Sequence, residues 1–128
     1  MNFGILGEAK IAREHVVPAI LNAGHKVTHV GRRIPGQAAL PKIYGNAIET
    51  DYENLINNPS VDAIYNPLPN HLHVPYSIEA LKAGKHVLCE KPVALNLDEL
   101  SQLENAAKDS KAFFYEAFMV RSHPQWHW

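Results

Sequence analysis

The stretch HVLCEKP, residues 86–92, ends an apolar run with a glutamate and a lysine that could do chemistry. Lysine is almost never fully buried without a partner, so Lys91 is either a solvated strand end or a charge with a specific role. Its ammonium group can donate a hydrogen bond to a hydroxyl or carbonyl oxygen and stabilise negative charge that develops there. Lys91 is therefore the candidate catalytic residue, and Glu90 and Pro92 are the neighbours that would hold its position.

A second chemical feature is the turn GEAKIA, which follows the first apolar run. It places Gly7, Ala9 and Ala12 at the three small positions of the G-x-G-x-x-G/A turn that binds a dinucleotide pyrophosphate at a helix N-terminus. Alanine replaces the second glycine, which still permits close backbone approach if that residue needs no positive φ. Alternatively, small residues here only let the first helix pack close to the sheet. The candidate cofactor residues are Gly7, Glu8, Ala9, Lys10, Ile11 and Ala12.

Two adjacent arginines indicate which dinucleotide this turn would bind. About twenty residues beyond such a turn, an acidic residue normally binds the ribose 2′-hydroxyl of NAD. The sequence there reads HVGRRIP and has no carboxylate. A guanidinium of Arg32 or Arg33 could instead form a charge-assisted fork with a 2′-phosphate. We predict NADP rather than NAD, and the alternative is a solvated basic loop.

Metal binding and thiol chemistry are not expected. His71 and His73 have no cysteine or acidic partner at ligand spacing, and His123 and His127 form no recognisable site. The single cysteine, Cys89, cannot form an internal disulfide and lies in an apolar run. It is predicted to be an inert core residue in an intracellular, cytoplasmic protein.

Composition and charge limit the classes of binding partner that are expected. The chain has 128 residues and a net charge of −1, with acidic and basic residues interspersed, so neither nucleic acid nor an anionic membrane is an expected partner. The N-terminus has no secretory signal pattern, and no run reaches the roughly 18 apolar residues of a membrane span. The length fits one domain that needs neither metal nor disulfide to fold.

The elements that must position these residues alternate between strands and helices. Apolar runs occur at NFGIL, KVTHV, VDAIYN, HVLCE and AFFYE. Helical spacing is predicted over residues 9–23, where Pro18 kinks or shortens the helix, and over 75–83 and 96–108, with Asn70 and Asn96 as caps. In the last helix, Leu97, Leu100, Leu103 and Ala107 are predicted to face the core. Such alternation predicts a doubly wound parallel sheet in three layers, α/β/α, with ligands outside the carboxyl ends of the strands.

Four stretches taken together, GILGEAKIA, VDAIYNPLPNHLH, GKHVLCEKPVAL and EAFMVRSHPQ, resemble the glucose–fructose oxidoreductase / inositol dehydrogenase / MocA family over nearly the whole chain. The similarity is to the N-terminal NAD(P)-binding domain, and most to the NADP-dependent dihydrodiol and sugar dehydrogenase members. This resemblance implies a Rossmann domain over residues 1–121, with residues 122–128 beginning the connection to a second α/β domain.

The resemblance also implies residue roles. Residues 7–12 would hold the pyrophosphate, and Arg32 and Arg33 would stand where the family recognises the 2′-phosphate. Lys91 would match the family's essential lysine, and Arg121 would lie near the opening of the cleft. The residues implied to border the ribose and nicotinamide are Leu68, Asn70, His73 and Glu90.

The function implied is hydride transfer between NADP and a sugar or cyclic diol. Family members carry much of their substrate pocket in the second domain, so this chain is expected to be inactive alone and to meet a small polyol or sugar only with that domain. The alternatives are a non-catalytic NADP(H)-binding or protein-interaction module and a remnant that binds nothing. Trp126 and Trp128 are expected to form an exposed apolar edge with a tendency to self-association, unless they fold back onto the sheet.

Overall fold

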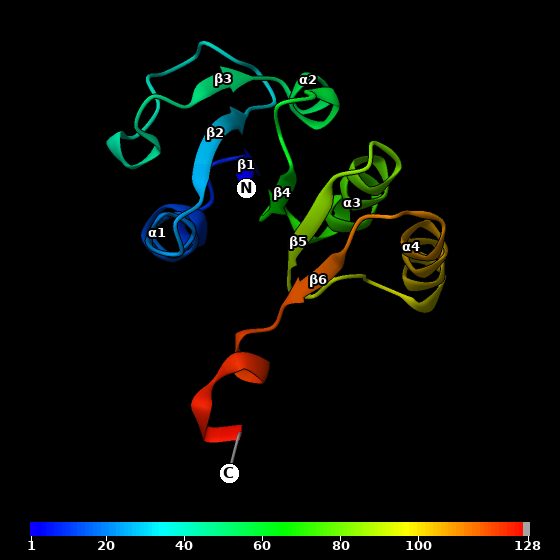
Figure 1. Ribbon diagram of the computed structural model, residues 1–128. Helices are drawn as coiled ribbons and strands as arrows, with labels where there is room; N and C mark the ends of the chain where they lie inside the picture. Colours follow the sequence, from blue (N-terminus) through cyan, green and yellow to red (C-terminus); the bar gives the residue numbers. More distant parts are fainter. Residues whose placement is uncertain (127–128) are drawn as a thin grey trace.

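The computed structural model describes residues 1–126 and contains one parallel six-stranded sheet (Figure 1). The strand order is β3-β2-β1-β4-β5-β6, so the order reverses between β1 and β4. Every neighbouring pair is parallel, which brings the carboxyl ends of all strands to one edge. The strands are β1 Asn2–Leu6, β2 Lys26–Gly31, β3 Ile48–Thr50, β4 Ala63–Asn66, β5 His86–Glu90 and β6 Phe114–Ala117.

Helices cover both faces of the sheet. Figure 1 shows α1 on one side and α2, α3 and α4 on the other. The α-helices are α1 Val17–Asn22, α2 Tyr52–Asn57, α3 His73–Lys82 and α4 Leu97–Asp109. Shorter helical segments are the π-helical η1 Ala12–Val16 and the 3₁₀ segments η2 Lys42–Tyr44, η3 Asn70–Leu72, η4 Met119–Ser122 and η5 Pro124–Trp126. No helix among residues 1–126 is long and apolar enough to cross a membrane.

The core has two parts because successive side chains of a strand point to opposite faces. Ile5 of β1 packs with Val17 and Ile20 on the α1 side, whereas the next residue, Leu6, packs with Leu55 and Leu81 on the other side. Strands buried on both faces are typical of parallel sheets. The predicted α/β/α doubly wound fold is confirmed.

One helix start differs from the sequence expectation. The helix predicted over residues 9–23 is interrupted before Pro18, as expected, and consists of η1 and α1, because Pro18 has no N–H and its ring excludes a regular turn before it. Asn70 is not the cap of α3, since that helix begins at His73 after η3 and has no side-chain cap. Asn96 does cap α4, with its Oδ1 accepting from the Glu99 amide at 2.9 Å.

Two elements and one core assignment escaped the sequence patterns. β3 and α2 are three and six residues long, too short for a hydrophobic period to be read. In α4, Leu103 is buried as predicted, but Leu97, the first residue of the helix, is 81% exposed.

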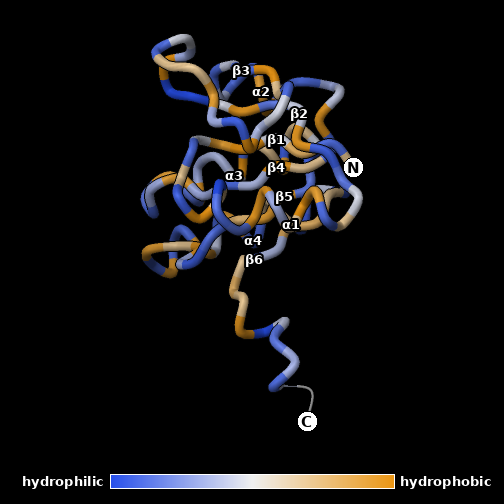
Figure 2. Tube along the Cα trace, turned by 90° about the vertical axis from the view of Figure 1, so that its left-hand side faces the viewer, coloured by the Kyte–Doolittle hydropathy of each residue, from blue (hydrophilic) through white to orange (hydrophobic). Residues whose placement is uncertain are grey.

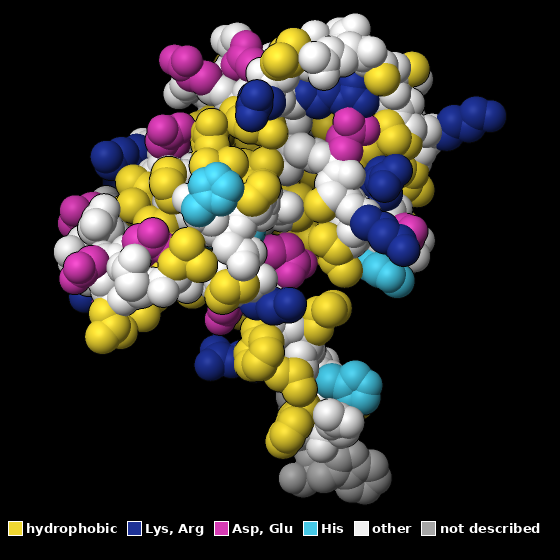
Figure 3. All heavy atoms as spheres, turned by 180° about the vertical axis from the view of Figure 1, so that it is seen from behind, with side chains coloured by type: hydrophobic (Ala, Val, Ile, Leu, Met, Phe, Trp, Pro, Cys, Tyr) yellow, Lys and Arg dark blue, Asp and Glu magenta, His cyan; other side chains and the backbone are white. Residues whose placement is uncertain are grey.

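The chain leaves the body after β6 (Figures 1 and 2). Hydrophobic side chains gather along this projecting segment (Figure 3). Phe118, Met119 and Trp126 are 44%, 64% and 63% exposed, so Trp126 does not fold back onto the sheet. The expected apolar edge is thus present among the described residues, whereas Trp128 lies outside them. The domain boundary at residue 121 and self-association stay predictions.

Candidate functional site

The turn after β1 has the backbone that a dinucleotide turn requires. Gly7 has a φ of +77°, and its amide donates to the Gly31 carbonyl at 2.8 Å, which joins the ends of β1 and β2. A Cβ atom on Gly7 would lie 3.2 Å from Cδ2 of Leu68. No described residue other than glycine has a positive φ, so alanine at position 9 is unstrained. Ala12 is fully buried in the α1-side core, as the third small position of the motif would be.

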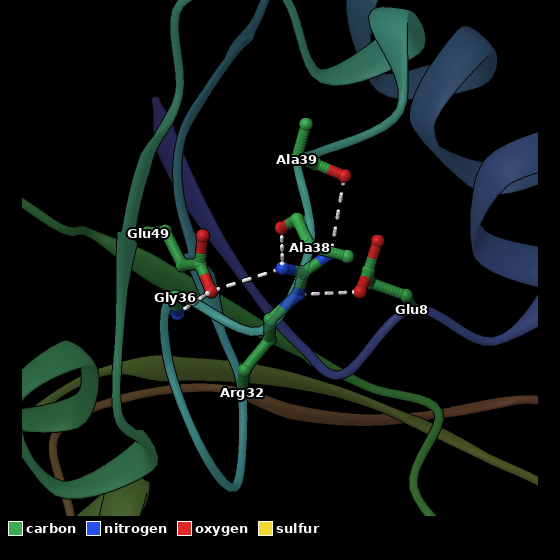
Figure 4. Close-up of polar contacts among 6 residues, drawn as sticks. All are labelled: Glu8, Arg32, Gly36, Ala38, Ala39 and Glu49. Atoms are coloured by element: carbon green, nitrogen blue, oxygen red, sulfur yellow. Dashed lines mark hydrogen bonds and ion pairs between the residues drawn. The ribbon is translucent and has the colours of Figure 1, made fainter.

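Arg32, directly after β2, is tied to four acceptors (Figure 4). Its Nε donates to Glu8 Oε2 at 2.5 Å, and its Nη1 donates to Glu49 Oε1 at 3.0 Å. The same Nη1 donates to the Ala38 carbonyl, and Nη2 donates to the Ala39 carbonyl at 3.5 Å. The guanidinium therefore joins the glycine turn, the loop after β2 and the strand β3.

The pKa values of Arg32 and Glu49 are both shifted in this cluster. The hydrogen bond to Glu8 is the main cause that raises the pKa of Arg32, although partial burial opposes it. The pKa of Glu49 is lowered, first by the hydrogen bond that its Oε1 accepts from the Gly36 amide at 2.7 Å and then by Arg32. Arg32 and Glu49 are thus both held in their charged forms.

The turn and the two arginines line one open pocket of about 480 Å³. The lining residues are Gly7, Glu8, Arg32, Arg33, Ile34, Gln37, Ala38 and Tyr52. Four of these are sequence-predicted site residues, and the structure brings them together. Arg33 is exposed, and among residues 1–126 its side chain has no hydrogen bond or ion pair. Lys10 and Ile11 lie outside the pocket at the helix start, where Lys10 is paired with Glu14 at 3.9 Å.

The second group of predicted residues surrounds the ends of β4 and β5. His73 is 1% exposed, and its Nδ1 and Nε2 each lie 2.7 Å from a carbonyl oxygen, of Pro92 and Leu68 respectively. Carbonyl oxygens only accept, so the ring nitrogen that carries a proton donates to its carbonyl. His73 therefore links the loop after β4 to the loop that carries Lys91.

Glu90 and Lys91 point to different environments. Glu90 Oε1 accepts from the hydroxyl of Tyr65 at 2.8 Å, and Tyr65 is fully buried. Burial, followed by this hydrogen bond, raises the pKa of Tyr65. Lys91 is exposed at the carboxyl edge, with no side-chain hydrogen bond among the described residues. The structure thus fixes the glutamate and leaves the lysine accessible.

Not every predicted residue joins these two groups. Asn70 is exposed in η3, next to the loop that holds Leu68. Arg121 lies in η4 on the projecting segment and contacts neither the pocket nor the Lys91 loop through a side-chain hydrogen bond. Sequence reasoning missed Gln37, Tyr52 and Tyr65, and no motif pointed to them, because each lies in the site only through the folded arrangement.

Metal-ligating side chains do not gather in the described part of the chain. Residues 1–126 contain no group of three or more His, Cys, Asp or Glu residues that could hold a metal ion. His127, one of the histidines considered from the sequence, lies outside the described residues.

Cys89 is expected to resist thiol reagents in the native chain. Its side chain is fully buried, and desolvation raises the pKa of its thiol to about 12, so the reactive thiolate is scarce. We expect modification by a maleimide or dithio reagent to be at least about a hundredfold slower in buffer than in urea, since reaction requires local opening. Rapid native labelling, measured by intact mass, would contradict this placement.

Comparison with known proteins identifies the arrangement. A family model described as an oxidoreductase family with an NAD-binding Rossmann fold matches residues 1–118. An uncharacterised oxidoreductase of Rhizobium meliloti is 42% identical over 134 residues, which span 98% of this chain and 39% of that protein. A D-xylose 1-dehydrogenase (NADP⁺) of Haloferax volcanii is 37% identical over 131 residues, which span 97% of this chain and 39% of that protein.

Solved structures agree with the sequence relatives. The crystal structure of KijD10, a 3-ketoreductase from Actinomadura kijaniata in complex with TDP-benzene and NADP, matches with a TM-score of 0.90 and 32% identity, covering 99% of this chain and 41% of that one. The chain thus spans about two-fifths of the length of these relatives. The family expected from the sequence is confirmed: the chain belongs to the glucose–fructose oxidoreductase / inositol dehydrogenase / MocA family of oxidoreductases, in the part that forms the NAD-binding Rossmann fold.

Proposed function

We propose that this chain is the NADP(H)-binding domain of an oxidoreductase that transfers hydride between NADP and a CH–OH group of a sugar or cyclic diol. The observation that carries the proposal is the pocket at the carboxyl edge, where the Gly7 turn and Arg33 lie together. The NADP named in the Haloferax dehydrogenase and in the KijD10 complex supports the choice of dinucleotide.

The residues present fit such a cofactor. The amides of the turn from Gly7 to Ala12 would receive the pyrophosphate, where the positive end of a helix favours an anion. The pocket beside Arg33 would receive the adenosine ribose. Leu68, Asn70, His73 and Glu90 would border the nicotinamide ribose and ring, beside the switch point between β1 and β4.

Lys91 is the residue proposed to touch the reacting oxygen. The bound nicotinamide supplies the hydride acceptor or donor, and the protein must stabilise charge on the substrate oxygen. An exposed ammonium at the end of β5 can donate a hydrogen bond there. Glu90, fixed by Tyr65, and Pro92, bonded through its carbonyl to His73, hold the backbone on both sides of Lys91.

In this proposal, substrate turnover requires a second domain like the one that makes up the remaining length of the relatives. Hydride transfer needs a substrate held at reacting distance and a group that gives or takes its proton, and among residues 1–126 no hydrogen bond or ion pair joins the Lys91 side chain to an acid or base. We also propose a cytoplasmic location, supported by the single cysteine without a disulfide partner. Residues 118–126 carry exposed apolar side chains. These side chains favour an interface in which another protein segment, or a second copy of the chain, covers them.

Titration of the purified chain with NADPH and with NADH tests the proposal. We expect enhanced nicotinamide fluorescence with both dinucleotides, tighter binding of NADPH, and no turnover of sugars or cyclic diols. Binding with full turnover would contradict the need for a second domain. Failure to bind either dinucleotide would favour the alternative of a fold that has lost its cofactor.

A further inference from the structure

The two arginines after β2 differ in how many hydrogen-bond donors they have available. A guanidinium carries five N–H groups, and a bidentate bond to a phosphate uses two of them. In Arg32, four of the five are directed at Glu8, Glu49 and the carbonyls of Ala38 and Ala39 (Figure 4). Arg32 therefore cannot donate two hydrogen bonds to a phosphate unless it gives up some of these contacts.

Charge leads to the same conclusion. The positive charge of Arg32 faces two carboxylates, Glu8 at 2.5 Å and Glu49 at 3.0 Å. Its side chain is only 12% exposed, so these pairs are partly shielded from water. A 2′-phosphate brought to Arg32 would meet both carboxylates, and like charges at such range repel one another. Within this cluster, Arg32 serves as the counter-ion of the protein's own acids.

Arg33 lies in the same pocket without such partners. It is exposed, and no hydrogen bond or ion pair joins its side chain to residues 1–126. Tyr52 of α2 lines the pocket beside it; burial raises the pKa of Tyr52, and the nearby charge of Arg33 partly offsets this. Arg33 is therefore the cation of this pocket whose full set of donors is available to a ligand.

We propose that Arg33 alone binds the 2′-phosphate of NADP(H), and that Glu8, by occupying Arg32 and adding negative charge to the pocket, limits how strongly the chain prefers NADP(H) over NAD(H). Arg32 is then a positioning residue that holds the Glu8 turn, the Ala38–Ala39 loop and β3 in place. This inference rests on the proposed function and divides between Arg32 and Arg33 a role that the sequence assigned to both.

The experiment compares Arg33→Ala, Glu8→Gln, Arg32→Lys and the control Lys111→Ala. Lys111 is an exposed cation before β6, at the opposite end of the strands from the pocket. Each purified chain is titrated with NADPH and NADH, and with adenosine 2′,5′-bisphosphate and AMP to isolate the ribose-phosphate end. Circular dichroism melting reports whether each variant remains folded.

Arg33→Ala should weaken NADPH about ten- to a hundredfold and leave NADH within about twofold, as expected for loss of a charge-assisted fork. Glu8→Gln should raise the NADPH preference several-fold, because a repelling carboxylate is removed. Arg32→Lys should weaken both dinucleotides together and lower the melting temperature. Lys111→Ala should change neither affinity.

Opposite results would overturn the inference. Selective loss of NADPH binding in Arg32→Lys, with Arg33→Ala unchanged, would show that the buried arginine is released to bind the phosphate. An unchanged or lower NADPH preference in Glu8→Gln would show that Glu8 does not oppose the phosphate. If the unaltered chain binds neither dinucleotide, the proposed function fails, and this inference with it; if it binds both and Arg33→Ala has no effect, only the inference fails.

Discussion

Replacing Gly7 by alanine is expected to weaken binding of both NADPH and NADH at least about tenfold. The φ of Gly7 is +77°, a conformation that costs a residue with a Cβ about 1–2 kcal/mol. The added methyl would also press on Leu68 Cδ2 at 3.2 Å. Since the Gly7 amide is bonded to Gly31, relief of this strain must shift the end of β1 and the amides that would receive the pyrophosphate. The measurement is the nicotinamide fluorescence titration.

Gly24→Ala is the matched control. Gly24 has nearly the same φ, +80°, but lies between α1 and β2, and nothing is within 4 Å of its missing Cβ. The control should lose a similar amount of stability in urea unfolding, about 1–2 kcal/mol, and retain its affinity for both dinucleotides. If Gly7→Ala binds NADPH as tightly as Gly24→Ala does, the turn is not the phosphate site.

The sequence was sufficient for the fold class, although not for β3 and α2, because the patterns that specify the class are local. Apolar runs alternating with helical spacing lead directly to a parallel sheet, and the carboxyl edge of such a sheet is where Gly7, Arg32 and Lys91 had to meet. The small residues of the turn and the cap at Asn96 are equally local signals. Each depends on neighbours within a few positions of the chain.

The division of roles between Arg32 and Arg33 depends on residues far away in the sequence. No local sequence pattern therefore predicts it. Glu8 and Glu49 are 24 and 17 residues from Arg32, and Glu49 lies on a strand too short to predict. Two adjacent arginines look equivalent in a sequence, but the fold buries one against acids and leaves the other exposed. A pattern of residue types can indicate that a phosphate is expected without indicating which guanidinium is available to it.

Backbone partners are still harder to foresee, and His73 shows why. The sequence argues against metal ligation by His73, and the family resemblance implies a place at the border of the nicotinamide site. Neither indicates that its two ring nitrogens contact main-chain carbonyls of Leu68 and Pro92. Any residue type supplies a carbonyl, so these contacts have no signature in the sequence. The consequence is that the position of Lys91 depends on a buried ring from α3.

His73→Ala is therefore expected to lower the free energy of unfolding by about 3 kcal/mol, whereas His71→Ala should change it by less than about 0.5 kcal/mol. His73 is buried at 1% exposure, and its removal leaves a cavity and takes away the ring that contacts both carbonyls; His71, two residues earlier in η3, is exposed and makes no such contact. Urea unfolding gives the stability, and hydrogen exchange of the amides of residues 91–94 reports the Lys91 loop, which should open more readily in His73→Ala only. A loss below about 1 kcal/mol, or unchanged exchange in that loop, would show that the ring fills space without holding the two loops together, because both effects follow from the same polar contacts of the ring.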